Sequence, residues 1–329
     1  MKLTVIGIGT WGTALAIHLH KNGHKVCLYG RVEDNTEMIR ETKSHPFLPG
    51  INIPTEIDIT TNLAEAVENE YLVIAVPSPY IREFISKIVN ITNKDKIIIN
   101  VAKGFEIESG KRISEIVSEV SDNKYKYCVL SGPTHAEEVA RELPAAIVSA
   151  SDDINIAKKI QMIFNNNVLR VYTSTDTIGV ELGGSFKNVV AIAAGAVDGL
   201  RFGDNAKAAL ITRGLHEMKV LGRILGADEN TFNGLTGVGD LIVTCMSKHS
   251  RNRGFGEKIG SGLKSEEILA NTSMVTEGVY ATKAFYLIAK KKNIELPITE
   301  EVYKTIYDGK NPLISFKDLM SREMKMESE

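Results

Sequence analysis

The sequence is poor in cysteine and has no block of charge of one sign. Its three cysteines lie far apart, are odd in number and show no metal-ligand spacing, so we expect neither a disulfide framework nor a metal site. Lys and Arg total 39 residues against 41 Asp and Glu, giving a formal net charge of -2. With no basic block and no RNA- or DNA-binding signature, no nucleic-acid partner is expected. The simplest compartment for such a chain is a reducing, cytoplasmic one.

Long hydrophobic runs are also missing. No uncharged stretch reaches roughly 18 strongly apolar residues, so no membrane span is predicted. The apolar run at residues 3–7 continues at once into a glycine loop, which is typical of a strand and not of a signal peptide. The 329 residues, 43% of them hydrophobic, are enough for one or two packed domains.

The first half of the chain alternates strand-like and helix-like segments. Short apolar runs predict strands at residues 2–7, 25–30, 71–76, 96–101, 127–130, 145–149 and 168–172. Amphipathic segments predict helices near residues 11–22, 80–91, 110–120 and 152–164. This alternation favours an α/β domain in which helices cover both faces of a mostly parallel sheet.

After about Tyr172 the strand pattern stops. From there the spacing predicts helices near residues 176–198, 205–225, 254–260, 265–270, 275–292 and 298–307. We therefore predict two domains, an α/β domain of residues 1–172 and an all-α domain of residues 173–329.

A glycine motif, G-x-G-x-x-G, follows the first predicted strand and opens the first predicted helix. In this motif the glycine at position 7 permits a tight turn, Gly9 lets the backbone approach a pyrophosphate, and Gly12 lets helix and strand pack closely. The free N–H groups of the helix then meet the phosphates. The motif in this position predicts a Rossmann-like dinucleotide site in the domain of residues 1–172.

The end of the second strand bears on the choice of cofactor. A site specific for NAD usually has an acidic residue there, but this chain has Arg31, with Glu33 and Asp34 just beyond. An arginine can pair with a 2′-phosphate, which favours NADPH or the use of both cofactors. The alternative is a surface arginine in a turn.

Lys187 is the most unusual charged residue of the chain. It is the one charge between Glu181 and Asp198, and on a helix its neighbours are small or apolar. Burial there lowers the pKa of an amine and makes it useful in proton transfer near neutral pH. The alternative is a lysine that extends along its own stem to solvent. Lys103 is another candidate, because it follows a strand on the side of a parallel sheet where ligands bind. The alternative is an ordinary solvated lysine.

Three more segments carry polar groups for a site. Thr134 and Glu137 have the spacing of a capping box, and His135 between them is either an acid–base residue or a polar neighbour of the site. Asp240 lies on a glycine-rich bend. The hydroxyl, guanidinium and amide of residues 250–252 suit an oxyanion, although exposed basic turns are common. Together these groups indicate a small phosphorylated substrate.

Taken in order, these motifs resemble the bacterial NAD(P)-dependent glycerol-3-phosphate dehydrogenase family over nearly the whole chain. The departures are small: Thr10 and Thr134 are conservative changes, and Arg201 stands where a small residue is frequent. The matching stretches are residues 7–16, 101–104, 130–138, 181–189, 202–214, 237–245, 249–252 and 275–278.

The resemblance implies reversible reduction of dihydroxyacetone phosphate to sn-glycerol 3-phosphate for phospholipid synthesis. It implies a Rossmann-like domain, an all-α domain like the C-terminal domain of 6-phosphogluconate dehydrogenase, and a homodimer. It gives Lys187 the acid–base role, with Lys103 and Asp240 also in catalysis. The substrate residues it implies are Lys103, Gly132, Thr134, Lys187, Asp240, Ser250, Arg251 and Asn252. The cofactor residues are Gly7, Gly9, Thr10, Trp11, Gly12, Arg31, Lys103, Ala136, Arg251, Val275 and Glu277.

Two other functions fit the two-domain pattern. One is a dehydrogenase for a β-hydroxy acid or a ketopantoate-like substrate, which would have no use for a phosphate-binding triplet at residues 250–252. The other is a dinucleotide sensor without catalysis, which would not need a lone buried lysine at position 187.

Overall fold

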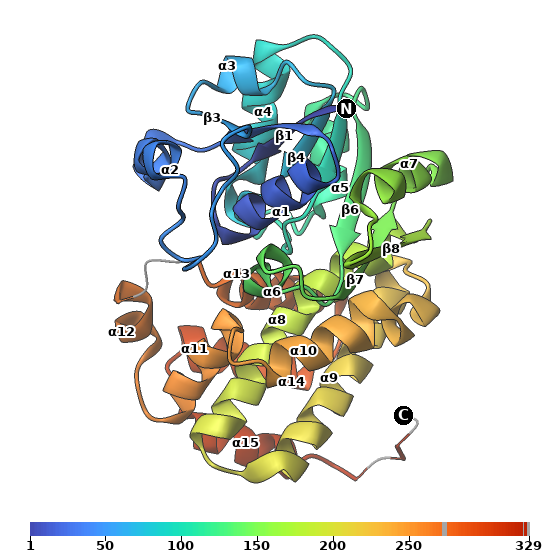
Figure 1. Cartoon of the computed structure of the whole chain (residues 1–329). Helices are drawn as coiled ribbons and strands as arrows, with labels where there is room; N and C mark the ends of the chain where they lie inside the picture. Colours follow the sequence, from blue (N-terminus) through green and yellow to red (C-terminus); the bar gives the residue numbers. More distant parts are fainter. Residues whose placement is uncertain (272–274, 325, 328–329) are drawn as a thin grey trace.

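The computed structural model describes residues 1–271, 275–324 and 326–327. An N-terminal α/β domain is followed by a C-terminal domain of helices, and the two lie one above the other in Figure 1. The last strand ends at Ser174 and the next helix begins at Thr177. The domain boundary expected between residues 172 and 173 stays a prediction.

The α/β domain contains one eight-stranded sheet in the order β3-β2-β1-β4-β5-β6-β7-β8. Every neighbouring pair is parallel except β6 and β7, which confirms the mostly parallel sheet. The sequence pattern did not predict β3, a three-residue edge strand too short to show alternation. The strands are β1 (Lys2–Ile6), β2 (Lys25–Tyr29), β3 (Asp58–Thr60), β4 (Tyr71–Ile74), β5 (Ile97–Asn100), β6 (Lys126–Ser131), β7 (Ala145–Ala150) and β8 (Leu169–Ser174).

Helices cover both faces of this sheet. Tyr71 and Val73 of β4 join the core under α1 and α7, whereas Leu72 and Ile74 join the core under α4 and α5. The loops that follow the carboxyl ends of β4 and β5 meet the second domain, where Ser78 contacts Glu277 and Lys103 contacts Asp240. The helices are α1 (Thr10–Lys21), α2 (Thr36–Thr42), α3 (Leu63–Ala66), α4 (Ile81–Ile91), α5 (Ile113–Val120), α6 (Ala136–Ala140) and α7 (Ile154–Phe164).

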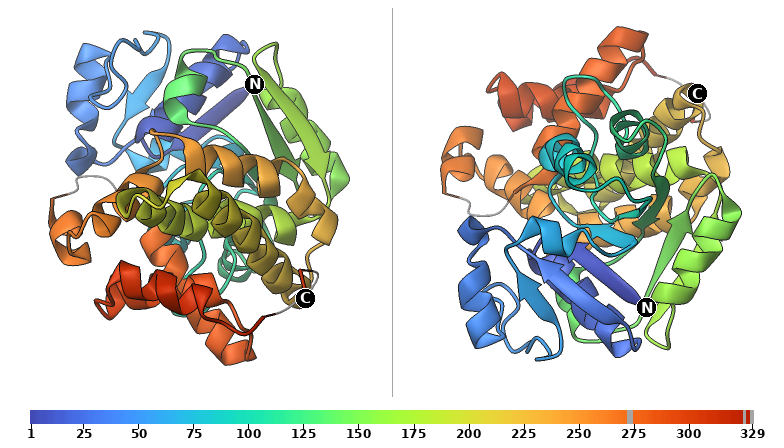
Figure 2. Two further views of the ribbon diagram at one scale, coloured as in Figure 1. Left: turned by 90° about the horizontal axis from the view of Figure 1, so that it is seen from below. Right: turned by 90° about the horizontal axis from the view of Figure 1, so that it is seen from above.

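The second domain is built around one helix, α8 (Thr177–Gly199), which Figure 2 shows surrounded by other helices. By length and composition α8 could cross a membrane, but 94% of its apolar window is buried inside the protein, as in a core helix. The sequence pattern predicted neither α10 nor α15. The other helices are α9 (Gly203–Leu225), α10 (Asp240–Met246), α11 (Arg251–Gly260), α12 (Ser265–Ala270), α13 (Glu277–Lys292), α14 (Pro297–Tyr307) and α15 (Pro312–Met320).

Glycines bring α8 and α11 into backbone contact. A Cβ on Gly195 of α8 would overlap the carbonyl of Arg253, and a Cβ on Gly256 of α11 would overlap the carbonyl of Ile192. Because the two backbones touch, the N-terminus of α11 has a fixed position relative to the middle of α8.

A buried carboxylate joins α8 to the sheet domain. Glu181 accepts hydrogen bonds from the Ser114 backbone N–H (2.9 Å), from the Ser114 hydroxyl (2.6 Å) and from the Tyr127 hydroxyl (2.6 Å). The Arg112 guanidinium lies 3.1 Å away and offsets its charge. Burial raises the pKa of Glu181, and Arg112 opposes that rise. This cluster fixes the start of α8 against α5 and β6.

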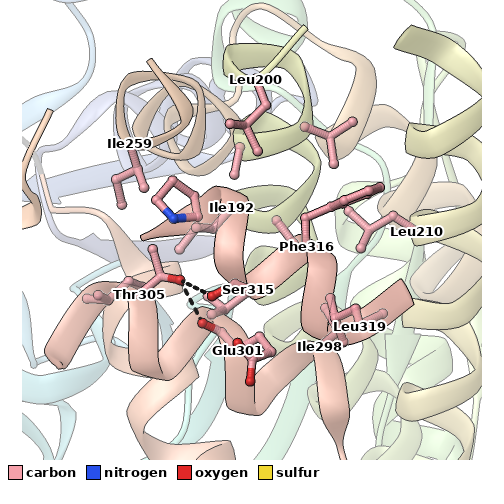
Figure 3. A pocket seen from close by; sticks show the side chains of 16 residues that line it. Ile192, Leu200, Leu210, Ile259, Ile298, Glu301, Thr305, Ser315, Phe316 and Leu319 are labelled. Atoms are coloured by element: carbon pink, nitrogen blue, oxygen red, sulfur yellow. Dashed lines mark hydrogen bonds between the residues drawn. The ribbon is translucent and has the colours of Figure 1, made fainter. Parts of the chain in front are cut away.

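The helical domain also has an apolar pocket, shown in Figure 3. Apolar side chains of α8, α14 and α15 line most of it and leave about 50 Å³ for water-sized molecules. Its one charged lining residue, Glu301, forms ion pairs with Lys304 and Lys310. None of the predicted site residues lines this pocket, so the functional site is elsewhere.

Candidate active site

The glycine motif has the backbone geometry that its sequence predicts. Gly7 has φ +117°, and a Cβ there would lie 2.6 Å from the carbonyl oxygen of Ala75. Gly12 packs so closely on Gly7 that a Cβ would overlap its carbonyl. In contrast, nothing lies within 4 Å of a Cβ built on Gly9, the residue before α1. The motif therefore leaves open space at the N-terminus of α1, as a bound pyrophosphate requires.

Other predicted cofactor residues border the same region. Thr10 and Trp11 begin α1, and Trp11 packs against the same small apolar cluster as Ala136, the first residue of α6. Arg31 follows β2 and is exposed. Its Nε lies 3.1 Å from Asp34, whose carboxylate holds the guanidinium in place. Both side chains of this pair are partly exposed, at 57% for Arg31 and 33% for Asp34, so the guanidinium is accessible in the turn after β2.

Lys187 is buried, with 6% of its surface exposed, so the alternative of a side chain that extends to solvent is wrong. Its Nζ donates a hydrogen bond to Oδ1 of Asp240. The other carboxylate oxygen of Asp240, which is fully buried, accepts from Nζ of Lys103 at 2.7 Å. One carboxylate thus bridges two lysines that come from different domains.

Burial lowers the pKa of Lys187 from 10.5 to about 7. The negative charge of Asp240 opposes this shift, and the positive charge of Lys103 adds to it. An amine with such a pKa is present at neutral pH both as the ammonium and as the free base. Those are the two forms that an acid–base residue needs for a reversible reaction.

The local backbone explains how Asp240 reaches Lys187. The glycine-rich bend is one π-helical turn (Leu235–Gly239) that leads directly into α10. A Cβ on Gly183 of α8 would overlap the carbonyl of Thr236, so this turn packs directly on α8. The hydroxyl of Thr244, one turn into α10, donates to the backbone oxygen of Asp240 (2.6 Å) and lies 3.3 Å from Oδ1.

The loop after β6 meets the same site. The carbonyl of Gly132 accepts a hydrogen bond from Lys103 at 3.1 Å, and φ of +153° makes this a position for glycine. The predicted capping box is wrong: α6 begins at Ala136 with His135 as its N-cap, and no side chain caps it. The reason is that the hydroxyl of Thr134 donates to Gly132 (3.2 Å) instead of accepting from the helix.

The predicted oxyanion triplet lies at the N-terminus of α11. Ser250 caps this helix and accepts from the Arg253 N–H at 3.2 Å. Arg251 is exposed, and its guanidinium donates to the carbonyl of Val275 (3.1 Å). Asn252 is buried and its amide is engaged at both ends, accepting from Gly278 N–H and donating to Asn188, both at 2.9 Å. Asn252 thus joins α8, α11 and α13 in this structure.

Sequence reasoning missed Ser78, Thr244 and Asn188. In the structure the carboxylate of Glu277 accepts from the Ser78 hydroxyl (2.7 Å) and backbone N–H (3.2 Å). Burial raises the pKa of Glu277. Asn188 follows Lys187 directly and Thr244 lies one helical turn after Asp240, so proximity to those residues was the available signal.

In the described part of the chain, no group of three or more His, Cys, Asp or Glu side chains could hold a metal ion. The charged centre of the site is instead the pair of lysines on Asp240, with the cofactor loop on one side and the α11 N-terminus on the other.

Comparison with known proteins gives the family. The model for the N-terminus of NAD-dependent glycerol-3-phosphate dehydrogenase matches residues 2–157, and the model for its C-terminus matches residues 176–317. The chain belongs to this family. It is 48% identical over 328 residues to a glycerol-3-phosphate dehydrogenase [NAD(P)+] of Thermoanaerobacter, covering 99% of each chain. The family resemblance found in the motifs is thereby confirmed.

Solved structures agree with this assignment. The fold matches a glycerol-3-phosphate dehydrogenase from Coxiella burnetii with a TM-score of 0.94 and 34% identity, over 98% of this chain and 99% of that one. A ketopantoate reductase from Ralstonia eutropha covers 97% of this chain and matches it with a TM-score of 0.61 at 12% identity, which shows a shared fold alone. The chain is therefore an NAD(P)-dependent oxidoreductase of the glycerol-3-phosphate dehydrogenase family, and it binds a small-molecule substrate.

Proposed function

We propose that the protein reversibly reduces dihydroxyacetone phosphate to sn-glycerol 3-phosphate, with Lys187 as the general acid and base. The observation that carries this proposal is the buried contact of Lys187 with Asp240, in a family whose members are named for glycerol-3-phosphate dehydrogenation. A bound nicotinamide supplies the hydride for the carbonyl carbon. The protein supplies the proton and the positively charged side chains that stabilise the developing negative charge.

The proton step follows from the charges at the site. As hydride reaches the carbonyl carbon, negative charge grows on the carbonyl oxygen. The Lys187 ammonium donates its proton to that oxygen, and in the reverse direction the amine removes the proton from the alcohol. Asp240 stabilises the ammonium form, and Lys103 adds positive charge beside the same oxygen. Without Asp240 a smaller fraction of Lys187 would be protonated at neutral pH.

The substrate phosphate is placed at the N-terminus of α11. Free N–H groups at a helix N-terminus and the exposed guanidinium of Arg251 together suit a dianion. Gly132 and Thr134 border the substrate from the sheet domain. Ser250 and Asn252, whose side chains hold the helix end, keep this geometry fixed.

For the cofactor, we propose NADPH in preference to NADH. The pyrophosphate would lie at the start of α1, where a Cβ on Gly9 meets no atom within 4 Å. The residues around it would be Gly7, Gly9, Thr10, Trp11 and Gly12. The ordered Arg31 would pair with the 2′-phosphate. Ala136, Val275 and Glu277 would border the remainder of the dinucleotide, together with Lys103 and Arg251.

The remaining parts of the proposal rest on the family. We place the protein in the cytoplasm, as a homodimer, where its product supplies glycerophospholipid synthesis. Three cysteines that the structure describes as free fit a reducing compartment.

The test of the proposed function is the initial rate of NADPH oxidation with dihydroxyacetone phosphate, for the wild type and for Lys187→Ala. We expect the variant to lose at least about 100-fold in kcat, since general acid–base catalysis contributes roughly 10²–10⁴. Cofactor affinity, followed by the fluorescence of bound NADPH, should stay within about threefold of the wild type. A variant with near-normal kcat would remove Lys187 from the mechanism.

Two alternatives are tested in the same assay. A dinucleotide sensor would show no loss of nicotinamide absorbance with any ketone. A ketopantoate-like enzyme would be insensitive to Arg251→Gln, whereas the proposed function predicts a rise in KM for the phosphorylated ketone.

A further inference from the structure

A second buried polar group lies beside the lysine pair, and the proposed mechanism does not use it. Nε2 of His135 is buried and has no hydrogen-bond partner within the described residues. A buried polar atom without a partner is unfavourable, and a ligand group that came within hydrogen-bond distance of Nε2 would satisfy it. In the tautomer that carries the proton on Nε2, this nitrogen is a donor.

The surroundings of His135 are rich in positive charge. Burial lowers the pKa of its imidazole, and the cations Lys187 and Lys103 lower it further. Two carboxylates of its own helix, Glu137 and Glu138, oppose this shift without cancelling it. His135 thus lies in a positively charged region that includes Lys187 and Lys103, which is an environment suited to an anion.

A second imidazole faces His135 from the other domain. The ring centroids of His135 and His249 are 5.9 Å apart with the planes tilted by 53°. His249 directly precedes Ser250, the cap of α11. His135 is therefore close to the segment that precedes α11, the helix end to which the proposed function assigns the substrate phosphate, and it is also within the electrostatic influence of the lysine pair.

We propose that Nε2 of His135 donates a hydrogen bond to the phosphate of the bound substrate, and so helps the enzyme to select phosphorylated ketones. This inference rests on the proposed function. A phosphate dianion would satisfy the unpaired nitrogen and would be shared between the two domains, with His135 on one side and the α11 N-terminus on the other. It would also raise the pKa of the ring, so that substrate binding draws a proton from solvent.

The test compares two substitutions of one residue. His135→Gln keeps an N–H donor close to the position of Nε2, whereas His135→Leu removes the donor and keeps a similar volume. We expect His135→Leu to raise KM for dihydroxyacetone phosphate roughly 10- to 100-fold, as for a lost hydrogen bond to a charged group, with kcat changed less than about threefold. His135→Gln should stay within about threefold of the wild type.

Unphosphorylated dihydroxyacetone is the matched control substrate. Its kcat/KM should be the same for the wild type and both variants, because it has no phosphate that could accept a hydrogen bond from His135. His216→Leu, a change of another histidine on α9, should leave both substrates unaffected. Thermal melting of each variant establishes that it is folded, and if His135→Leu does not fold, His135→Ala takes its place in the comparison.

The outcomes separate the two proposals. An unchanged KM in the variant without the donor would overturn the role of His135 while leaving the proposed function intact. Equal losses with both ketones would also overturn it, because the residue would then act on something other than the phosphate. A wild type that does not reduce dihydroxyacetone phosphate would overturn the proposed function and this inference together.

Discussion

Replacing Asp240 by asparagine gives the sharpest test of the charge arrangement. The change keeps the shape of the side chain and removes the negative charge that bridges Lys187 and Lys103. At an effective dielectric constant of about 20, two unit charges about 4 Å apart interact by about 4 kcal/mol, which corresponds to about three pKa units. Relaxation and water reduce this, so we expect the Lys187 pKa to fall by about one to three units.

The direction of the effect on activity follows from the protonation state. Reduction needs the ammonium, and burial has already lowered the pKa of Lys187 toward neutral pH. Each further pKa unit lost reduces the protonated fraction up to about tenfold, so kcat for reduction at pH 7 should drop at least about fivefold. Lowering the pH should restore part of this loss, and the rise of the oxidation rate with pH should begin at a more acid pH.

The assay is kcat against pH for both directions. The matched control is Asp198→Asn on α8, the helix of Lys187, where the carboxylate bridges Lys207 (2.8 Å) and Arg253 (2.7 Å) instead of the two site lysines. That variant should keep the pH midpoint of the wild type. If Asp240→Asn also keeps that midpoint while its thermal melting shows a folded protein, the coupling between Asp240 and Lys187 is refuted.

Three further predictions concern other parts of the molecule. Arg31→Ala should lower kcat/KM for NADPH and leave the NADH value unchanged, because only NADPH carries the 2′-phosphate; equal losses would contradict this. Arg201 has φ +60°, so Arg201→Gly should stabilise the fold by about 0.5–1 kcal/mol, seen as a higher melting temperature. Glu217 accepts from the N–H groups of Ile298 and Thr299, and burial raises its pKa to about 7. Because the pKa of Glu217 is higher in the folded than in the unfolded protein, the stability linked to its protonated form is complete below about pH 4.5 and is lost as pH rises through 7. Glu217→Gln cannot ionise, so its melting temperature should depend less on pH over this range.

The strands and long helices were predictable because their patterns are local. Apolar runs such as Tyr71–Ile74 are buried on both faces, and the 23 residues of α8 give a continuous helical signal. Short elements carry too few residues for a pattern. Thus β3, with three residues, and α10, which follows a glycine-rich turn, emerged only from their packing on neighbouring elements.

The candidate site was predictable in its residue types and not in its contacts. An isolated lysine among small residues indicated burial at position 187, and the structure places it there. No sequence pattern could show that Asp240 would also bind Lys103, since 137 residues separate them and the contact exists only when the domains meet. The same reason hid Ser78, whose partner Glu277 lies in the other domain.

The backbone contact between α8 and α11 fixes the distance between Lys187 and the α11 N-terminus. This distance cannot change unless the two helices move apart, because their glycines bring the backbones into direct contact. If Lys187 is the proton donor and the substrate phosphate binds at the α11 N-terminus, as proposed, the fold sets the distance between the two. A ketone longer or shorter by one carbon would then present its carbonyl out of reach of the lysine, so the enzyme would select substrates by chain length.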